Sequence, residues 1–206
     1  MFTPNTSTSL SRRGFSTKLC FLFFFFYSSM GFAQSIQFSK DSIPVVNDEV
    51  IFSIKFNYDL NKEEFKRKAY FYLNGKLDPY SGFFITNNED STTCRITDYL
   101  EISVSAISTF AVYITYNMNL TYEDGYCSMI IKDITYMEKQ YYETQEKSVR
   151  KLNMPEYSGK DIMIDEKLRW FMKKNYSKNI TEATIERING IIKDLDLIFI
   201  TKGTGS

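Results

Sequence analysis

The side chains that most often do chemistry in proteins are scarce in this chain or stand in turns. Its 206 residues include no histidine, which removes imidazole from any nucleophile–base relay and from any metal site. The sequence has no glycine-rich phosphate loop, dinucleotide fingerprint, paired-cysteine metal motif or nucleophile elbow. We therefore predict no catalytic residue, no metal and no cofactor, and we expect the protein not to be an enzyme.

Two pairs of adjacent carboxylates are the remaining candidates for acid–base chemistry, Glu89-Asp90 and Glu123-Asp124. A pair of carboxylates can divide acid and base roles in hydrolysis. Each pair here lies in a predicted turn, where acidic side chains commonly accept hydrogen bonds from their own backbone. We interpret both pairs as turn residues, and a weak calcium contact at such a turn is the alternative.

Cys94 and Cys127 could form a disulfide in an oxidising compartment. Both fall in predicted strands, where a free cysteine packs as a small apolar side chain. A disulfide needs the two Cα atoms within about 7 Å, and the sequence does not show that these strands are neighbours. The sequence is compatible with two alternatives, one disulfide or two buried thiols.

The element that organises the chain is a predicted β-hairpin at residues 111–136. Apolar and polar residues alternate along its first arm, which is the period of a strand with one buried face. Asp124-Gly125 separates the two arms, and glycine accepts the positive φ of a two-residue hairpin turn. That turn sets three cross-strand pairs, Tyr122 with Cys127, Leu120 with Met129, and Met118 with Ile131.

A strand and a helix precede the hairpin. Alternation over residues 50–58 predicts the strand, and Asn61, with Glu64 at the capping-box position, begins a helix that Gly75 is predicted to end. The apolar stripe of this helix is Phe65, Ala69, Tyr72 and Leu73. Two further strands, 82–86 and 92–102, are separated by a polar turn.

After the hairpin, residues 138–160 form a charged connector, in which Pro155 and Gly159 disfavour a regular element. Residues 161–206 are predicted to be a helical appendage. Its short first helix would contain Ile164, Leu168, Trp170, Phe171 and Met172. Its second helix would begin at a capping box formed by Asn179 and Glu182. The apolar stripe of that second helix would be Ile185, Ile188, Ile192 and Leu195. Asn189-Gly190 predicts a kink or an early end, and the stripe could dock on the sheet or on a partner.

Residues 1–33 have the pattern of a secretory signal peptide. Three basic residues precede the apolar run 19–27, and small residues favour cleavage between Ala33 and Gln34. The run is too short for a membrane span, so we expect none after cleavage. General secretion is favoured over the twin-arginine route that Arg12-Arg13 resembles. Residues 34–49 would form a lead-in to the fold.

The middle of the chain resembles a known family over roughly residues 50–137. The likeness is carried by a strand, the helix KEEFKRKAYFYLNGKL, then FFITNNEDSTTCRI and VYITYNMNLTYEDGYCSMIIKDITY, with Asp124-Gly125 and Lys132-Asp133-Ile134 as its closest echoes. The family is a domain of unknown function described as having a TATA-binding-protein-like (TBP-like) fold. The resemblance implies an α+β fold, a β-α-β-β-β antiparallel sheet with one helix packed on a face, accompanied by C-terminal helices. It implies no activity.

The family occurs mostly in exported proteins of Bacteroidetes-type bacteria, which implies the periplasm or cell envelope of a Gram-negative bacterium. Ser42 and Ser91 match the short pattern that such bacteria O-glycosylate, each following an aspartate. Basic and acidic residues number 25 each, so removal of a basic leader leaves a mildly acidic chain. That charge disfavours nucleic acid and anionic membranes, and a fold name does not import DNA binding.

We therefore expect a binding or interaction module with an unknown envelope partner. A small-ligand carrier is the alternative, with a cavity between sheet and helix. Its lining would be Phe52, Ile54, Phe56, Phe65 and Leu73, which could equally fill that space. A mainly structural subunit with a docking helix is a further alternative. Tyrosines of the central hairpin either pack the sheet or form a surface for a partner or a glycan: Tyr113, Tyr116, Tyr122, Tyr126 and Tyr136.

Overall fold

The computed structural model describes residues 37–58, 60–77, 81–105, 108–123, 125–143, 156–167 and 176–200. By its contacts the chain divides into two units, 1–35 and 36–206, and the elements described below belong to the second. The predicted leader and its cleavage site at Ala33 and Gln34 lie outside the described residues. None of the described helices combines the length and the apolar character that crossing a membrane requires.

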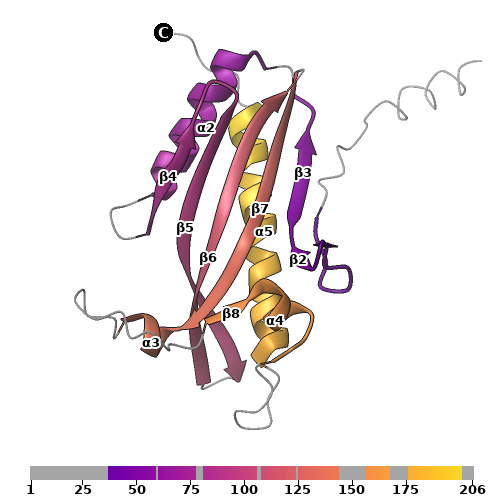
Figure 1. Cartoon of the computed structure of the whole chain (residues 1–206), viewed down its shortest axis with the longest axis vertical. Helices are drawn as coiled ribbons and strands as arrows, with labels where there is room; N and C mark the ends of the chain where they lie inside the picture. The colour runs from indigo at the N-terminus through magenta and orange to yellow at the C-terminus, as the bar shows by residue number, and fades with distance from the viewer. Residues whose placement is uncertain are drawn as a thin grey trace, which may run out of the picture. The chain divides into compact units, whose positions relative to one another are not determined.

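Five strands form an antiparallel sheet in the order β3-β7-β6-β5-β4, and a short sixth strand, β8, pairs with β7 beyond the start of β3 (Figure 1). Their bounds are β3 (Phe52–Phe56), β4 (Gly82–Asn87), β5 (Ser91–Ser105), β6 (Ser108–Glu123), β7 (Tyr126–Glu138) and β8 (Glu156–Ser158). The predicted α+β class and antiparallel sheet are confirmed. A separate two-stranded hairpin joins β1 (Val45–Val46) to β2 (Glu49–Val50), so the predicted first strand is broken at Ile51.

The β6–β7 hairpin has the predicted register. Tyr122 pairs with Cys127, Leu120 with Met129, and Met118 with Ile131. Gly125 has a φ of 82°, a conformation that strains residues with a Cβ. The pattern did not reveal a bulge farther from the turn, where the register shifts after Thr115 and Asp133 takes a φ of 54°. There Asp133 accepts a hydrogen bond from Asn117 Nδ2 at 2.6 Å.

Helix α2 (Lys62–Lys76) begins as predicted, because Asn61 Oδ1 accepts the Glu64 N–H at 2.9 Å. Its predicted stripe is buried against the sheet. The predicted end is wrong: Gly75 lies inside the last turn, and the Leu77 N–H still donates to the Leu73 carbonyl at 3.1 Å. Gly75 does not take the left-handed conformation that would stop the helix.

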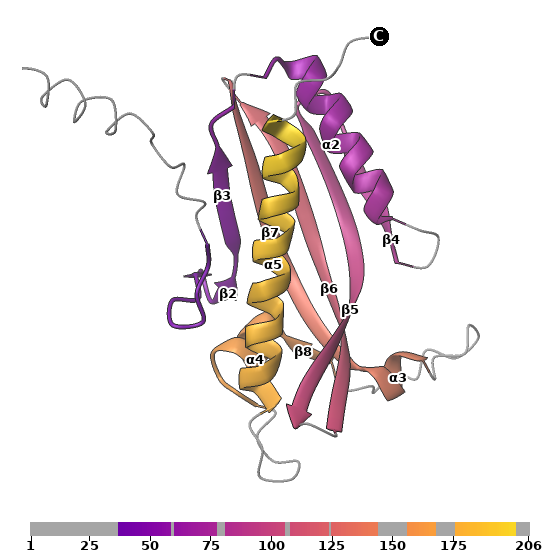
Figure 2. The same ribbon diagram turned by 180° about the vertical axis from the view of Figure 1, so that it is seen from behind.

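Helix α5 (Tyr176–Ile200) lies along the same face of the sheet as α2 (Figure 2). It begins before Asn179, so the predicted capping box is wrong, and it continues unbroken past Gly190. The predicted stripe is buried against the sheet, and Ile180, Ile191 and Phe199 extend it. All of these residues except Ile185 belong to one core with the strands, so α5 is part of the domain rather than an appendage.

Residues 138–160 contain regular elements that the sequence did not predict: α3 (Lys139–Glu143), β8 and the start of α4 (Gly159–Met163). Ser158 and Asp161 form a reciprocal capping box at the start of α4. Gly159 allows close packing rather than breaking a helix, because a Cβ there would lie 3.2 Å from Ile134 Cβ, a tight contact. Ile164 ends α4 and is exposed, and the other predicted members of that helix lie outside the described residues.

The segment before β1 packs on the domain. Asn189 of α5 accepts the Phe38 N–H at 2.9 Å and donates to the Phe38 carbonyl at 3.0 Å, as a neighbouring strand would. The Phe38 ring meets Phe52 edge-on with centroids 4.9 Å apart. Asn189-Gly190, which predicted a helix kink, therefore contains the residue that anchors the lead-in segment, Asn189.

Candidate functional site

The predicted carboxylate pairs serve local structure where they are described. Lys62 Nζ at the start of α2 lies 2.6 Å from Asp90 Oδ1 and 3.3 Å from Glu89 Oε2, so one cation joins the helix to the β4–β5 turn. Asp90 and Glu123 line one open groove of 680 Å³, while Asp124 lies outside the described residues. Among the described side chains, no cluster of three or more metal-binding types could hold an ion.

Cys94 and Cys127 are both buried and free. Cys94 lies on β5 and Cys127 on β7, with β6 between them, so the disulfide alternative does not fit the strand order. Burial raises the pKa of the Cys94 thiol to about 12 and that of Cys127 to about 11. Both side chains are therefore protonated, unreactive parts of the core at neutral pH.

The two candidate glycosylation serines differ in exposure. Ser42 is exposed and forms an isolated backbone bridge with Ser39. Ser91 is half-buried at the start of β5, and its hydroxyl accepts a hydrogen bond from Asn119 Nδ2 at 3.4 Å. Ser42 is thus the more accessible of the two, and neither modification is tested by the structure.

The residues expected to line a ligand cavity are buried in the core. Phe56 and Phe65 each have a ring centroid 5.8 Å from that of Phe199. Phe199 belongs to α5, the helix whose position the sequence did not give. The space expected between the sheet and α2 is therefore shared with a second helix.

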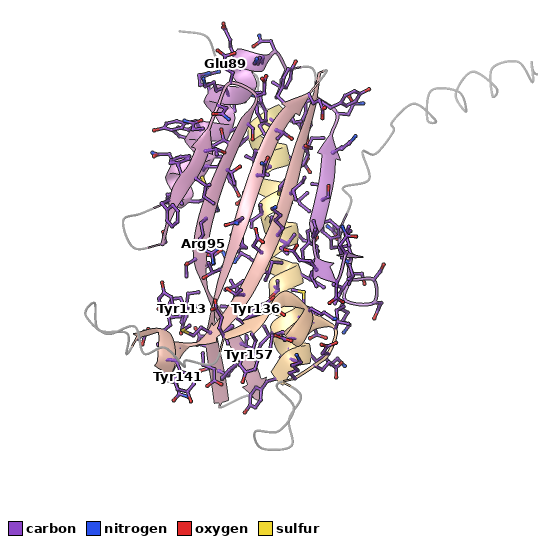
Figure 3. All side chains as sticks on the ribbon, in the orientation of Figure 1. Glu89, Arg95, Tyr113, Tyr136, Tyr141 and Tyr157 are labelled. Carbon is purple, nitrogen blue, oxygen red and sulfur yellow. The ribbon has the colours of Figure 1, made fainter. Side chains whose placement is uncertain are left out.

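The hairpin tyrosines divide between the two faces of the sheet. Tyr116 and Tyr136 point inward, where Tyr136 Oη lies 2.9 Å from Thr184 Oγ1 of α5. Tyr113 lies on the face turned away from α5, stacked on Tyr142 at 3.9 Å and edge-on to Tyr99 at 5.3 Å (Figure 3). The other two are Tyr122, whose hydroxyl donates to the Leu60 carbonyl at 3.0 Å, and Tyr126, which is exposed at the turn.

The outward face of the sheet is polar and internally bonded. Arg95 Nη1 donates to Asn117 Oδ1 at 3.3 Å, and Thr97 and Thr115 share a hydrogen bond of 3.1 Å. Figure 3 shows Arg95 and Tyr113 on this face, with α5 behind the strands. These side chains satisfy one another across strands, as expected for a face that meets water.

A groove of 420 Å³ lies between α5, the end of α2 and the middle of β5, and we call it the β5 groove. Its lining residues are Lys76 of α2, Tyr99, Leu100 and Glu101 of β5, and Ala183, Glu186, Arg187, Gly190, Ile191 and Asp194 of α5. No sequence pattern pointed to this site, because its three walls come from segments far apart in the chain. The spacing of the α5 residues marks one helix face, which was the only local signal available.

Beyond Ile96, the edge of β5 that faces away from β6 has no strand partner among the described residues, which do not include residues 78–80. β4 pairs with β5 only as far as Gly82 opposite Ile96, and beyond that point β6 is the sole described strand beside β5. The Thr97 N–H donates to the Ser81 carbonyl, which points Thr97 away from β6. Backbone groups alternate along an antiparallel strand, so those of Tyr99 and Glu101 also point away from β6, into the groove. Among the described residues, Arg187 Nη2 reaches the Tyr99 carbonyl at 3.5 Å.

The charges around the groove do not balance. Its two cations face carboxylates: Lys76 Nζ lies 3.2 Å from Asp194 Oδ2, and Arg187 Nε lies 3.6 Å from Asp98 Oδ2. Glu101 on β5 and Glu186 on α5 are exposed and have no ion-pair partner in the described part of the chain. The surroundings of the β5 groove are therefore negative, with one unpaired carboxylate on α5 and one at the β5 edge, on the outward face.

Tyr72 of α2 belongs to the same neighbourhood. Its side chain is 5 % exposed, and its hydroxyl has no hydrogen-bond partner among the described residues. Burial raises the pKa of Tyr72, and the nearby carboxylates of Asp194 and Asp98 raise it further. An unsatisfied buried hydroxyl costs free energy, so the polar arrangement behind the groove is not optimised for stability.

Comparison with known proteins shows what this arrangement resembles. No protein-family model matches the sequence, and no curated protein matches it. Two solved structures are similar at 14% sequence identity. A DUF4468 family protein from Bacteroides ovatus matches with a TM-score of 0.59 over 80% of this chain and 94% of that chain. A TBP-like protein from Parabacteroides distasonis matches with a TM-score of 0.58 over 78% and 99%.

The likeness establishes the fold. This chain has the TBP-like α+β fold that its middle segment predicted, and both neighbours come from bacteria of the kind that the resemblance implied. The match spans nearly the whole of each neighbour and includes more of this chain than residues 50–137. At this identity it transfers no ligand and no activity, because function depends on the residues of a site.

Proposed function

We propose that the protein is an exported, non-catalytic binding module of the cell envelope and that the β5 groove is its binding site. The observation that carries the proposal is the combination of a strand edge without a partner among the described residues, the groove beside it, and two unpaired carboxylates close to that edge. Polar groups that lack partners within a protein gain free energy when a ligand supplies them. The groove's lining includes no nucleophile hydrogen-bonded to a base, which favours binding over catalysis.

The groove can be blocked at a single position. Gly190 lines it, and a Cβ there would have no heavy atom within 4 Å apart from its own helix, so Gly190→Phe fills the groove without disturbing the core. Gly75→Phe is a matched control, because Gly75 is also a helical glycine with open space and does not line the groove. Both variants should fold like the unchanged protein.

Crosslinking in envelope fractions of the source bacterium tests the proposal. We expect the unchanged protein and Gly75→Phe to capture one dominant partner and Gly190→Phe to lose it. Capture of the same partner by all three proteins would mean that the binding surface lies elsewhere.

The volume of the groove favours a small-ligand carrier as the second candidate. Its 420 Å³ falls within the range of about 300–1,000 Å³ that is usual for small-molecule sites. Native mass spectrometry distinguishes this function: a co-purified small molecule should be present in the unchanged protein and absent from Gly190→Phe. A mass that persists in Gly190→Phe would exclude the groove as its site.

Export is supported by the leader pattern of residues 1–33. N-terminal sequencing of the protein from a periplasmic or envelope fraction should begin at Gln34. A chain that retains its first residues in the cytoplasmic fraction would contradict export.

A further inference from the structure

The backbone of β5 at the groove has the features of a strand that accepts another strand. The N–H groups of Tyr99 and Glu101 and the Glu101 carbonyl point into the groove, and none has a hydrogen-bond partner among the described residues. β4 already occupies this side of β5 from Thr92 to Ile96, so the next strand position along the same line begins where the groove begins. Proteins usually cover or charge such an edge to prevent pairing with other chains.

The opposite wall leaves room for an extended chain. The groove face of α5 includes Ala183 and Gly190, which carry little or no side chain. From Ala183 to Asp194 this face is about 16 Å long at 1.5 Å per residue. An extended chain rises about 3.3 Å per residue, so the groove has the length of roughly five residues.

The charge around the groove indicates which side chains a bound peptide segment would have. Glu101 stands at the strand edge with its side chain on the face turned away from α5, because its neighbours Leu100 and Ile102 are buried on the inward face. Glu186 lies on the α5 wall, whereas Lys76 and Arg187 are already paired with carboxylates. Side chains of an added strand alternate between the two faces of the sheet, so a lysine or arginine would lie beside Glu101 on the outward face or beside Glu186 on the α5 side. An acidic segment, or the phosphates of a nucleic acid, would be repelled by the same groups.

We infer that the β5 groove binds an extended, basic peptide segment of a partner protein, which adds to the sheet as a strand beside Tyr99–Glu101. This inference rests on the proposed function of the groove as the binding site. It specifies a mode of recognition: main-chain hydrogen bonds along β5 supply affinity, and the two glutamates supply specificity.

The probe is a capped five-residue peptide, acetyl-Thr-Lys-Thr-Lys-Thr-amide, titrated into the isotope-labelled protein and followed by nuclear magnetic resonance. We expect saturable shifts centred on Tyr99 and Glu101, and slower exchange of these two amides while that of Leu100 is unchanged. The same peptide with glutamate in place of lysine should bind at least about tenfold more weakly. A version methylated on alternate backbone nitrogens, which cannot donate along the edge, should lose a similar factor.

Two protein variants complete the test. Glu101→Gln with Glu186→Gln should weaken binding of the lysine peptide by about 1.5- to 5-fold, because the lysines on one face of the peptide form an exposed ion pair with one of these two carboxylates. Glu63→Gln, an exposed carboxylate in the first turn of α2, is the matched control and should leave binding unchanged.

Failure of this inference is distinguishable from failure of the proposed function. Absence of binding at millimolar peptide, equal binding of the glutamate or methylated peptide, or shifts centred away from β5 would each overturn strand addition. The proposed function would still stand if Gly190→Phe loses its envelope partner. If Gly190→Phe keeps that partner while the lysine peptide binds at β5, the peptide site is real and the envelope partner uses another surface.

Discussion

The first half of β5, up to Ile96, and the second half, from Thr97 on, have equally buried inward side chains, but their backbones differ in strand pairing. On the inward face, Cys94 and Ile96 in the first half and Leu100 and Ile102 in the second are all at most 4 % exposed. The first half has β4 on one edge and β6 on the other, whereas the second half has β6 on one edge and the β5 groove on the other. Burial of side chains and pairing of backbone are therefore separate properties of this strand.

The difference teaches where a binding site can be placed at little cost in stability. Helices α2 and α5 both pack on β5, and the inward side chains of both halves are buried, so the hydrophobic contribution to folding is retained along the whole strand. The open edge gives up only hydrogen bonds that water supplies in the unbound protein. Binding can then use those backbone groups without any rearrangement of the core.

The largest predicted effect tests whether α5 packs in the core on the inward face of the sheet. Leu195 is 0 % exposed on α5, and Leu195→Ala should reduce the free energy of unfolding by about 2–5 kcal/mol. Leu197→Ala on the same helix is the matched control, because Leu197 is 59 % exposed and should change stability by about 0.5 kcal/mol or less. Urea unfolding of both variants makes the measurement, and equal effects would show that α5 does not pack as described.

Amide hydrogen exchange addresses the pairing difference directly. The Thr97 N–H donates to the Ser81 carbonyl, and the Leu100 and Ile102 amides face β6, so these three should be protected. The Tyr99 and Glu101 amides face the groove and should exchange on the order of 100-fold faster than their neighbours. Uniform protection from Thr97 to Ile102 would mean that the edge is already paired within the protein.

The hairpin could be predicted because its determinants are local. Alternation and Asp124-Gly125 fixed which residues face each other, and the cap at Asn61 is set by a neighbour three residues away. The order of the strands is not local: Cys94 and Cys127 could be assigned to strands but not to positions on either side of β6. The same limit hid the β5 groove, which exists because β4 is shorter than β5.

Glycines and polar residues gave wrong predictions of helix starts and interruptions, because tertiary packing decides these positions. Gly159 and Gly190 predicted interruptions, yet one allows close packing against Ile134 and the other lies in an unbroken helix. Asn179 has capping chemistry, but α5 starts earlier, at Tyr176. Fold class and element types follow from the sequence, whereas the site depends on edges and ends that several segments define together.

Two buried tyrosines differ in whether the hydroxyl has a hydrogen-bond partner among the described residues. Tyr136 Oη shares a buried hydrogen bond of 2.9 Å with Thr184, so Tyr136→Phe should cost about 1 kcal/mol. Tyr72 has a buried hydroxyl without a partner among the described residues, so Tyr72→Phe should be neutral or stabilising by up to about 1 kcal/mol. Thermal unfolding compares the two. A cost for Tyr72→Phe as large as that for Tyr136→Phe would show that the Tyr72 hydroxyl is bonded in solution.

The smallest predicted effect concerns Arg187, which links the second half of β5 to α5. Its ion pair with Asp98 is 3.6 Å long and partly exposed, so Arg187→Gln should reduce stability by less than about 1 kcal/mol, and added salt should diminish the difference. The same change removes a positive charge and the donor to the Tyr99 carbonyl, so the lysine peptide should bind about two- to fivefold more tightly. Lys62→Gln is the matched control, because Lys62 also forms exposed ion pairs and does not line the β5 groove. Weaker peptide binding by Arg187→Gln would mean that Arg187 contacts the ligand, and the groove would then select an acidic group rather than a basic one.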